Sequence, residues 1–407
     1  MKLTNNAKEL IDFYKKNGLQ FNQELNNSVT EILKNFYDEF TDAFAYVRNI
    51  KRKDFNLTIN KLTSVNQIPK PLSVAHNFIT TEVKNAISDQ LVSSYTYTMT
   101  SFLERKLTIT FVTNLDDPHN SKNITKYNKY FKNMLVWLYI INEYALELCS
   151  NTLKILIYHI DLPKELPKSK NDVIGKLHAN TAYSTPCPIN AEIVIYRFEE
   201  WFRAFIHETI HSFGLEFSII DHSICSKYIL TKFYANSNVD LYEAYTEFWA
   251  KNINVMFCSF VSSTSFDVFK NNFKSLITLE IIHSCFQMIK VLNHMRLNYV
   301  SLISEETSKQ IYKEEANVLS YYVITFVLMY FYQDFLLWCE TNNSEIMSFK
   351  MTQKNIHSFC NFIGNKYNNQ ELLQFVSLVQ NKFVLSLKKN ESSPIFTNLR
   401  MTLCELH

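Results

Sequence analysis

His207-Glu208-Thr209-Ile210-His211 is the stretch around which the rest of the chain is interpreted. Histidines four residues apart lie one turn apart on the same face of a helix, so both imidazoles can bind one metal ion. The glutamate between them, Glu208, is placed to take a proton from a water molecule that completes the metal's shell. This arrangement of residue types predicts hydrolytic chemistry.

The residues on either side of this stretch predict a buried helix. Glu199 and Glu200 are expected in its first turn, where the helix dipole favours acidic groups, and Gly214 is expected just past its end. Apolar side chains recur every three or four residues, as in a helix that packs into a core: Trp201, Phe202, Phe205, Ile206, Ile210 and Phe213.

A third metal ligand must come from elsewhere. Phe217 occupies the position where one class of zinc peptidases has a third histidine, and its side chain cannot bind metal. The later segment Asp240-Leu-Tyr-Glu-Ala-Tyr-Thr-Glu247 offers carboxylates one helical turn apart. We predict that Glu243 binds the metal and that Glu247 orients a ligating imidazole, although the reverse assignment remains open.

Composition limits the class of protein. The chain has 407 residues, of which 47% are hydrophobic and 20% charged, and its formal net charge is +2. These values are typical of a folded protein of two or three domains, and the near-neutral charge argues against a nucleic-acid partner. The eight cysteines form no CxxC pair, so we favour free thiols in a reducing compartment over an extracellular set of disulfides. The N-terminus has no apolar signal segment, and a cytoplasmic location is expected.

The order of expected elements predicts an α+β protein in three regions. Residues 1–90 read as helical, with helices in 10–46 and 74–90 and a loop over 51–71; residues 91–258 form the catalytic core; residues 259–407 form a helical lobe. The core is expected to contain a hairpin (94–103 and 105–112), a helix (124–149) and strands 153–159 and 191–197. The apolar stretch 318–331 is interrupted by polar residues, so a buried helix is favoured over a membrane span. His159, within an apolar strand, is interpreted as a packed residue.

The two motifs carry a resemblance to a known family. The run I-x-I-Y-R-x-E-E-W before the paired histidines and the later E-A-Y-x-E-F-W-A are similar to sequences of uncharacterised zincin-like metallopeptidases of the gluzincin type, encoded by giant and other large nucleocytoplasmic DNA viruses. The resemblance covers roughly residues 95–260. It implies a zincin-like upper lobe with a small mixed sheet. It also implies that an edge strand formed by Asn180, Thr181, Ala182 and Tyr183 binds the substrate backbone.

These observations together predict a Zn²⁺-dependent metallopeptidase. His207, His211 and Glu243 would bind the ion, and Glu208 would activate a zinc-bound water for attack on a peptide bond. By position, Tyr321, Tyr322 and His283 are candidates for stabilising the oxyanion. A peptide or protein is the expected substrate. The alternative is a non-catalytic viral structural or host-interaction protein that zinc stabilises. The oligomeric state and the cleavage specificity stay open.

Overall fold

The computed structural model describes residues 4–72, 78–388 and 393–405 and divides the chain into two compact units. The sheet unit comprises Lys34–Pro163 and Asn180–Leu215, and the helical unit comprises the residues up to Leu33, Lys164–Ala179 and those from Glu216 onward. This division differs from the predicted boundaries at residues 90 and 258. Residues 34–90 belong with the sheet, and the helix that carries Glu243 packs against later helices, so contacts distant in sequence set the boundaries.

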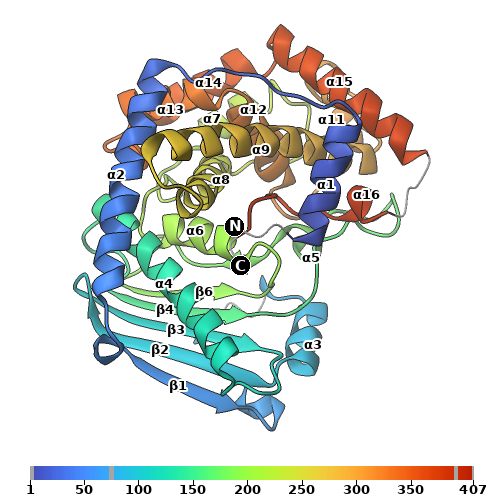
Figure 1. The fold of residues 1–407 in the computed structure, drawn as a ribbon. Helices are drawn as coiled ribbons and strands as arrows, with labels where there is room; N and C mark the ends of the chain where they lie inside the picture. The colour runs from blue at the N-terminus through green and yellow to red at the C-terminus, as the bar shows by residue number, and fades with distance from the viewer. Residues whose placement is uncertain (1–3, 73–77, 389–392, 406–407) are drawn as a thin grey trace. The chain divides into compact units, whose positions relative to one another are not determined.

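One mixed six-stranded sheet forms the frame of the sheet unit, in the order β1-β2-β3-β4-β6-β5 (Figure 1). β3 pairs with β4, and β4 with β6, in parallel, whereas the other neighbours are antiparallel. The coarse α+β prediction is therefore confirmed. The strands are β1 (Asn56–Lys61), β2 (Ser93–Phe102), β3 (Arg105–Thr113), β4 (Thr152–Tyr158), β5 (Ala182–Tyr183) and β6 (Asn190–Ile195).

The hairpin of β2 and β3 agrees with the prediction. Its turn consists of Leu103 and Glu104, whose φ angles of 50° and 65° match the left-handed turn that suits the twist of paired strands. The predicted loop over residues 51–71 is wrong at β1. That strand is mostly exposed and pairs through its backbone with β2 at the edge of the sheet. Its alternation contains only two apolar residues, Leu57 and Ile59, which is too short a pattern to identify a strand.

The core of the sheet unit lies between the sheet and helix α4 (Ser121–Tyr144). Tyr97 of β2 stacks on Phe131 of α4 with ring centroids 4.3 Å apart, and Tyr95 stacks on Tyr127 at 4.4 Å. His159 is 5% exposed and its Nδ1 lies 3.1 Å from the Tyr127 hydroxyl, as expected for a packed histidine. The aromatic layer fixes α4 on this face of the sheet.

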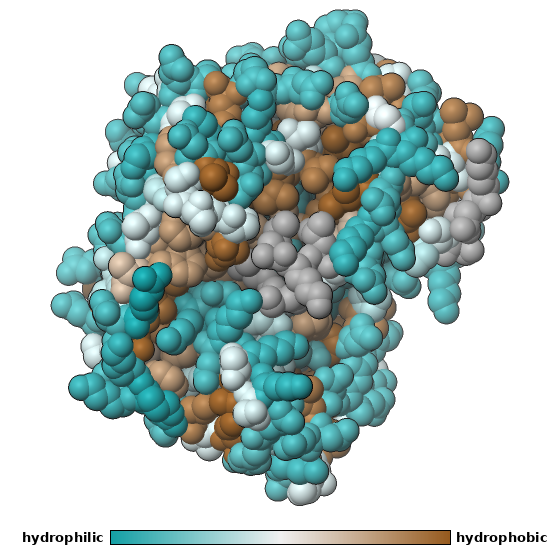
Figure 2. Space-filling model, in the orientation of Figure 1, coloured by the Kyte–Doolittle hydropathy of each residue, from teal (hydrophilic) through white to brown (hydrophobic). Residues whose placement is uncertain are grey.

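The helices at the start of the chain are close to the predictions. Gly18, with φ of 65°, follows α1 (Asn5–Lys16), and α2 (Asn27–Asn49) comes next. The short helices η1 (Arg52–Asp54) and η2 (Val65–Gln67) flank β1, and α3 (Thr81–Gln90) precedes β2. Residues 74–77 of the predicted 74–90 helix lie outside the described residues. In the view of Figure 2, hydrophilic side chains cover most of the surface and apolar ones occur in small groups.

The helical unit is built around α9, a helix of 29 residues of which most are buried. α9 is also long and apolar enough to cross a membrane by length and composition, but 78% of its apolar window is buried inside the structure. Residues 319–330, from the predicted buried helix, form π-helix η4 followed by α12, and most of them are buried. The unit contains α5 (Lys176–Ala179), α7 (Ser223–Ile229), α8 (Leu241–Val261), α9 (Phe266–His294), α10 (Tyr299–Ser304), α11 (Ser308–Ile311), η4 (Leu319–Ile324), α12 (Thr325–Tyr330), α13 (Tyr332–Asn342), α14 (Gln353–Lys366), α15 (Gln370–Leu387) and α16 (Pro394–Thr397).

Candidate metal centre

The paired histidines lie on α6 (Trp201–Ser212), a helix whose twelve residues are all buried. The expectation that Glu199 and Glu200 lie in its first turn is wrong. Both precede Trp201, and Glu200 is the N-cap residue in the left-handed conformation, with its carboxylate 3.6 Å from Arg203 Nε. The backbone therefore turns sharply between β6 and α6, and a buried ion pair spans the entry to the helix.

The end of α6 agrees with the prediction. Gly214 has φ of 74° and donates its N–H to the His211 carbonyl, while the next N–H bonds to the Ile210 carbonyl at 3.0 Å. This pair of bonds is the common glycine-terminated helix end. A Cβ at this position would also lie 2.9 Å from Leu146 Cδ1 and 3.0 Å from Cys149 Sγ. Gly214 is thus required both by its backbone angle and by a close approach.

The His207 and His211 rings meet on one face of α6. Their Nε2 atoms are 3.1 Å apart, and each residue is 6% exposed. Two imidazole nitrogens bound to one tetrahedral zinc ion at ordinary bond lengths would be about 3.3 Å apart. The pair therefore has nearly the separation that a shared ion requires, and metal binding by these two side chains stays a prediction.

Glu208 is held by a residue that the sequence analysis did not identify. Ser184, which directly follows β5, donates its hydroxyl to Glu208 Oε2 at 2.6 Å and also lies 3.2 Å from the Glu208 carbonyl oxygen. Glu208 is 7% exposed. Burial raises the pKa of the Tyr196 phenol, and the charge of Glu208 raises it further. One hydrogen bond fixes one carboxylate oxygen, which leaves the other able to accept a proton.

The opposite side of α6 is anchored to α4. Trp137 Nε1 donates to Thr209 Oγ1 at 2.7 Å, and that hydroxyl lies 2.8 Å from the Ile206 carbonyl oxygen. Both side chains are fully buried. Thr209, the middle residue of the motif, therefore points away from the helix face that carries the histidines. Its hydrogen bond to Trp137 fixes how α6 is rotated about its axis.

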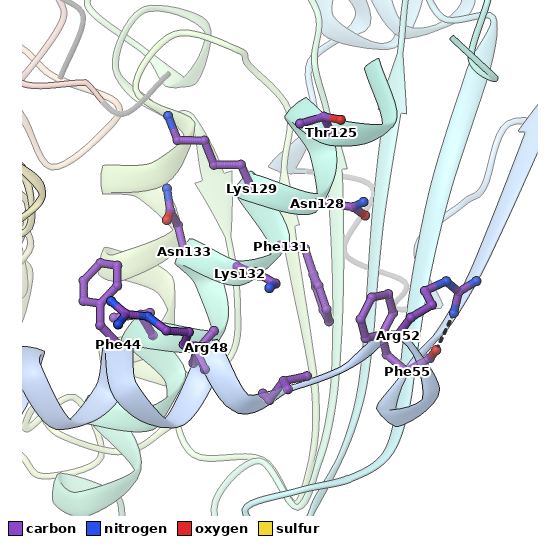
Figure 3. Close-up of a pocket in the computed structure, with 13 residues that line it drawn as sticks. Phe44, Arg48, Arg52, Phe55, Thr125, Asn128, Lys129, Phe131, Lys132 and Asn133 are labelled. Carbon is purple, nitrogen blue, oxygen red and sulfur yellow. Dashed lines mark hydrogen bonds between the residues drawn. The ribbon is translucent and has the colours of Figure 1, made fainter. Parts of the chain in front are cut away.

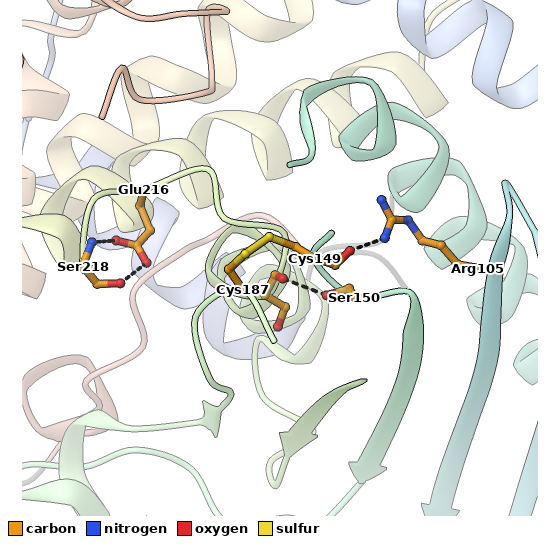
Figure 4. The surroundings of a disulfide bond; sticks show 7 residues. Arg105, Cys149, Ser150, Cys187, Glu216 and Ser218 are labelled. Carbon is orange, nitrogen blue, oxygen red and sulfur yellow. Dashed lines mark hydrogen bonds between the residues drawn. A yellow bond between two sulfur atoms is a disulfide. The ribbon is translucent and has the colours of Figure 1, made fainter. Parts of the chain in front are cut away.

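A disulfide joins Cys149 to Cys187, so the prediction that all the cysteines are free thiols is wrong (Figure 4). The residues before β4 and after β5 bring the two thiols together beside the end of α6, where Cys187 N–H donates to the His211 carbonyl at 3.0 Å. The guanidinium group of Arg105 donates to the Cys149 carbonyl and lies 4.7 Å from the ring of Phe213. The other six cysteines are buried thiols.

The predicted substrate strand is shorter than expected. Only Ala182 and Tyr183 form β5, which is the last strand in the sheet order and pairs with β6. Asn180 and Thr181 precede it, and their carbonyls accept hydrogen bonds from Arg197 Nε and from Tyr196 N–H. The ring of Tyr183 stacks on Phe78. The prediction of an edge strand is correct for its last two residues.

In the helical unit, Glu243 lies in the first turn of α8 and Glu247 one turn further along the same face. Glu243 is half-buried and Glu247 is fully buried. A further turn on, Lys251 is 2% exposed and donates to Ser284 Oγ at 3.0 Å. The two acids therefore lie on one helix face, as predicted.

The three predicted oxyanion donors lie on α9 and η4. His283 has no exposed surface, and its ring nitrogens lie 2.7 Å from the Tyr14 hydroxyl and 3.0 Å from the Arg400 carbonyl oxygen. Tyr322 is buried and donates to the Leu399 carbonyl. These enclosed positions argue against His283 and Tyr322 as donors to a substrate. Tyr321 is half-buried, and its role stays a prediction.

Comparison with known proteins adds no assignment. No protein-family model matches the chain, and no curated protein or solved structure matches it significantly.

Proposed function

We propose that this protein is a zinc-dependent metallopeptidase in which His207, His211 and Glu243 hold the ion. The observation that carries the proposal is the pair of imidazole nitrogens 3.1 Å apart beside a glutamate whose carboxylate is fixed by a hydrogen bond. Two histidines and one carboxylate are a common ligand set of catalytic zinc, with one position left for solvent or substrate.

The choice of the third ligand is supported by residue chemistry. Two imidazoles and one carboxylate suit a zinc ion, and Glu243 is the carboxylate that the spacing of the second motif predicts for this role. Glu247, one turn away on the same face of α8, is the right type of residue to accept the second N–H of a ligating imidazole. Glu243 is therefore the ligand in this proposal and Glu247 the orienting acid.

The chain's own groups have separate roles in this reaction. A bound zinc ion supplies Lewis acidity, which makes a water molecule easier to deprotonate and a peptide carbonyl easier to attack. Glu208 accepts the proton from water and passes it to the amine that leaves. Ser184 holds one oxygen of Glu208 by a hydrogen bond, and the other oxygen would accept the proton in this proposal. β5 offers main-chain groups at the edge of the sheet, where an extended peptide would pair with it as an added strand.

A non-catalytic zinc site is the second candidate. The observation in its favour is the burial of both histidines and of Glu208, each of which is at most 7% exposed. A structural zinc site, however, usually fills all four positions with protein ligands and has no use for a general base. The presence of Glu208 between the ligands therefore favours catalysis.

The experiment compares the wild-type protein with three single variants, for metal content and for cleavage of a peptide library. Glu208→Gln should retain one zinc per chain and lose peptide turnover by roughly 10²–10⁴-fold, because its amide cannot accept the proton. Glu243→Gln should lose zinc, whereas Glu247→Gln should weaken zinc binding by roughly 10–100-fold. Wild-type protein that holds zinc but cleaves no peptide would leave the structural candidate standing. Wild-type protein that binds no zinc would contradict both candidates.

A further inference from the structure

A cavity in the sheet unit lies between α2, the segment that follows α2, and α4 (Figure 3). Its volume is about 550 Å³, which is within the usual range for small-molecule sites. No residue of the proposed metal centre lines it. The residues around it are Phe44, Val47, Arg48, Ile50, Arg52, Phe55, Thr125, Asn128, Lys129, Phe131, Lys132, Asn133 and Val136.

The interior wall of this cavity is apolar. Six aliphatic or phenyl side chains line it, and three of them, Val47, Phe131 and Val136, are buried. Phe55 packs against Phe131 with ring centroids 5.1 Å apart, so the wall is continuous between η1 and α4. The uncharged polar residues of the lining are Thr125, Asn128 and Asn133, and the side-chain oxygen Oδ1 of Asn128 already accepts a hydrogen bond from the Tyr97 hydroxyl. An alkyl chain needs no hydrogen-bond partner against the six apolar side chains.

The rim of the cavity is cationic. Arg48, Arg52, Lys129 and Lys132 line it, and no Asp or Glu is among the lining residues. Four positive charges gather here in a chain whose formal net charge is only +2. Arg52 is positioned by a hydrogen bond to the Phe55 carbonyl at 2.7 Å, and its guanidinium lies 5.1 Å from the Phe55 ring. Charges of one sign beside a low-dielectric wall attract an anion strongly.

Helices α2 and α4 place apolar and basic side chains next to one another along the cavity. On α2, Phe44 and Val47 lie one turn apart, and Arg48 follows on the next position toward solvent. On α4, Phe131 is buried while its neighbour Lys132 is exposed. Along the same cavity, α2 therefore offers apolar side chains beside Arg48, and α4 offers apolar side chains beside Lys129 and Lys132 (Figure 3).

We infer that this cavity binds a single-chain amphiphile with an anionic head group, with its alkyl chain on the apolar wall and its head group among the four cations. The inference does not depend on the proposed peptidase activity. The probe is dodecanoate, offered to the full-length protein below its micellar concentration and measured by isothermal titration calorimetry.

Three ligand comparisons test the chemistry. Dodecanoate should bind with one molecule per chain, and decanoate should bind roughly tenfold more weakly because two fewer methylene groups are buried. Dodecan-1-ol, which has no charge, should bind at least tenfold more weakly than dodecanoate. ATP, which has the charge but no alkyl chain, should compete poorly. Equal affinity for the two chain lengths, equal affinity for the alcohol, or preferred binding of ATP would overturn the inference.

A matched pair of variants tests the location. Arg48→Glu with Lys132→Glu should weaken dodecanoate binding roughly tenfold or more, because both charges at the rim are reversed. Lys53→Glu with Lys122→Glu changes the net charge by the same amount at η1 and α4 positions that do not line the cavity, and it should change the affinity less than twofold. All four residues are exposed, so both variants should fold. Equal losses in the two variants would place the binding elsewhere and overturn the inference.

Discussion

Replacing Gly214 with alanine tests how closely the end of α6 approaches its neighbours. Gly214 and Gly18 both have positive φ, 74° and 65°, and both follow a helix. An added Cβ at Gly18 meets nothing within 4 Å, whereas at Gly214 it meets Leu146 Cδ1 at 2.9 Å and Cys149 Sγ at 3.0 Å. Both substitutions place an alanine in the left-handed conformation, which costs free energy, but only the substitution at Gly214 also crowds neighbouring atoms.

The magnitudes follow from this comparison. A left-handed alanine costs about 1–2 kcal/mol, and the reduced entropy of the unfolded chain returns about 0.4–1 kcal/mol. Gly18→Ala should therefore lower the free energy of unfolding by about 1 kcal/mol. Crowding in a packed site adds about 1–3 kcal/mol, so Gly214→Ala should cost about 3 kcal/mol. Part of this crowding should be relieved by Leu146→Ala in the same chain, since Leu146 is 42% exposed and removal of its Cδ1 opens the space.

Urea denaturation followed by tryptophan fluorescence measures both effects. Trp137 and Trp201 lie in the sheet unit, and Trp249 and Trp338 lie in the helical unit, so unfolding of either unit changes the emission. Equal losses for Gly214→Ala and Gly18→Ala would refute the close approach at the end of α6. An unchanged loss after Leu146→Ala would show that Leu146 is not its source.

Three further predictions concern the disulfide, a buried histidine and the partner of Glu208. Replacing both Cys149 and Cys187 with serine should lower the free energy of unfolding by roughly 4 kcal/mol, because the disulfide closes a loop between residues 38 positions apart. In urea titrations, dithiothreitol should destabilise the wild-type protein but not this variant. Burial lowers the pKa of His283 well below its usual value, and the charge of Lys251 lowers this pKa further. The unfolded chain therefore binds a proton at His283 that the folded chain does not. Stability should therefore fall as the pH drops below about 6.5, by up to about 1.4 kcal/mol per pH unit for this group, and His283→Gln should flatten that slope between pH 7 and 5; an unchanged slope would contradict the assignment. Ser184→Ala should reduce peptide turnover by roughly 10–100-fold with zinc content unchanged, and a loss of zinc instead would mean that the serine supports the ligands and not the base.

Ser184 shows why the sequence revealed only part of the site. Nothing in the residues around it marks it as a partner of Glu208, because the contact depends on β5 meeting β6 at the edge of the sheet. Trp137 was missed for the same reason, since its partner Thr209 is 72 residues away. His283 was proposed from its position in the sequence, and the packing of Tyr14 and Arg400 around it argues against that role.

The sequence by itself determined the features that depend on neighbours within one helical turn or one strand. The imidazoles of His207 and His211 on one face, the acids Glu243 and Glu247 on another helix, the glycine after α6 and the β2–β3 hairpin all follow from such local spacing. Only the tertiary structure decided the disulfide, the exposed edge strand β1, the division into two units and the basic cavity beside α4. Those features join segments far apart in the chain, and their free energy comes from the burial and pairing of whole surfaces, which local spacing does not encode.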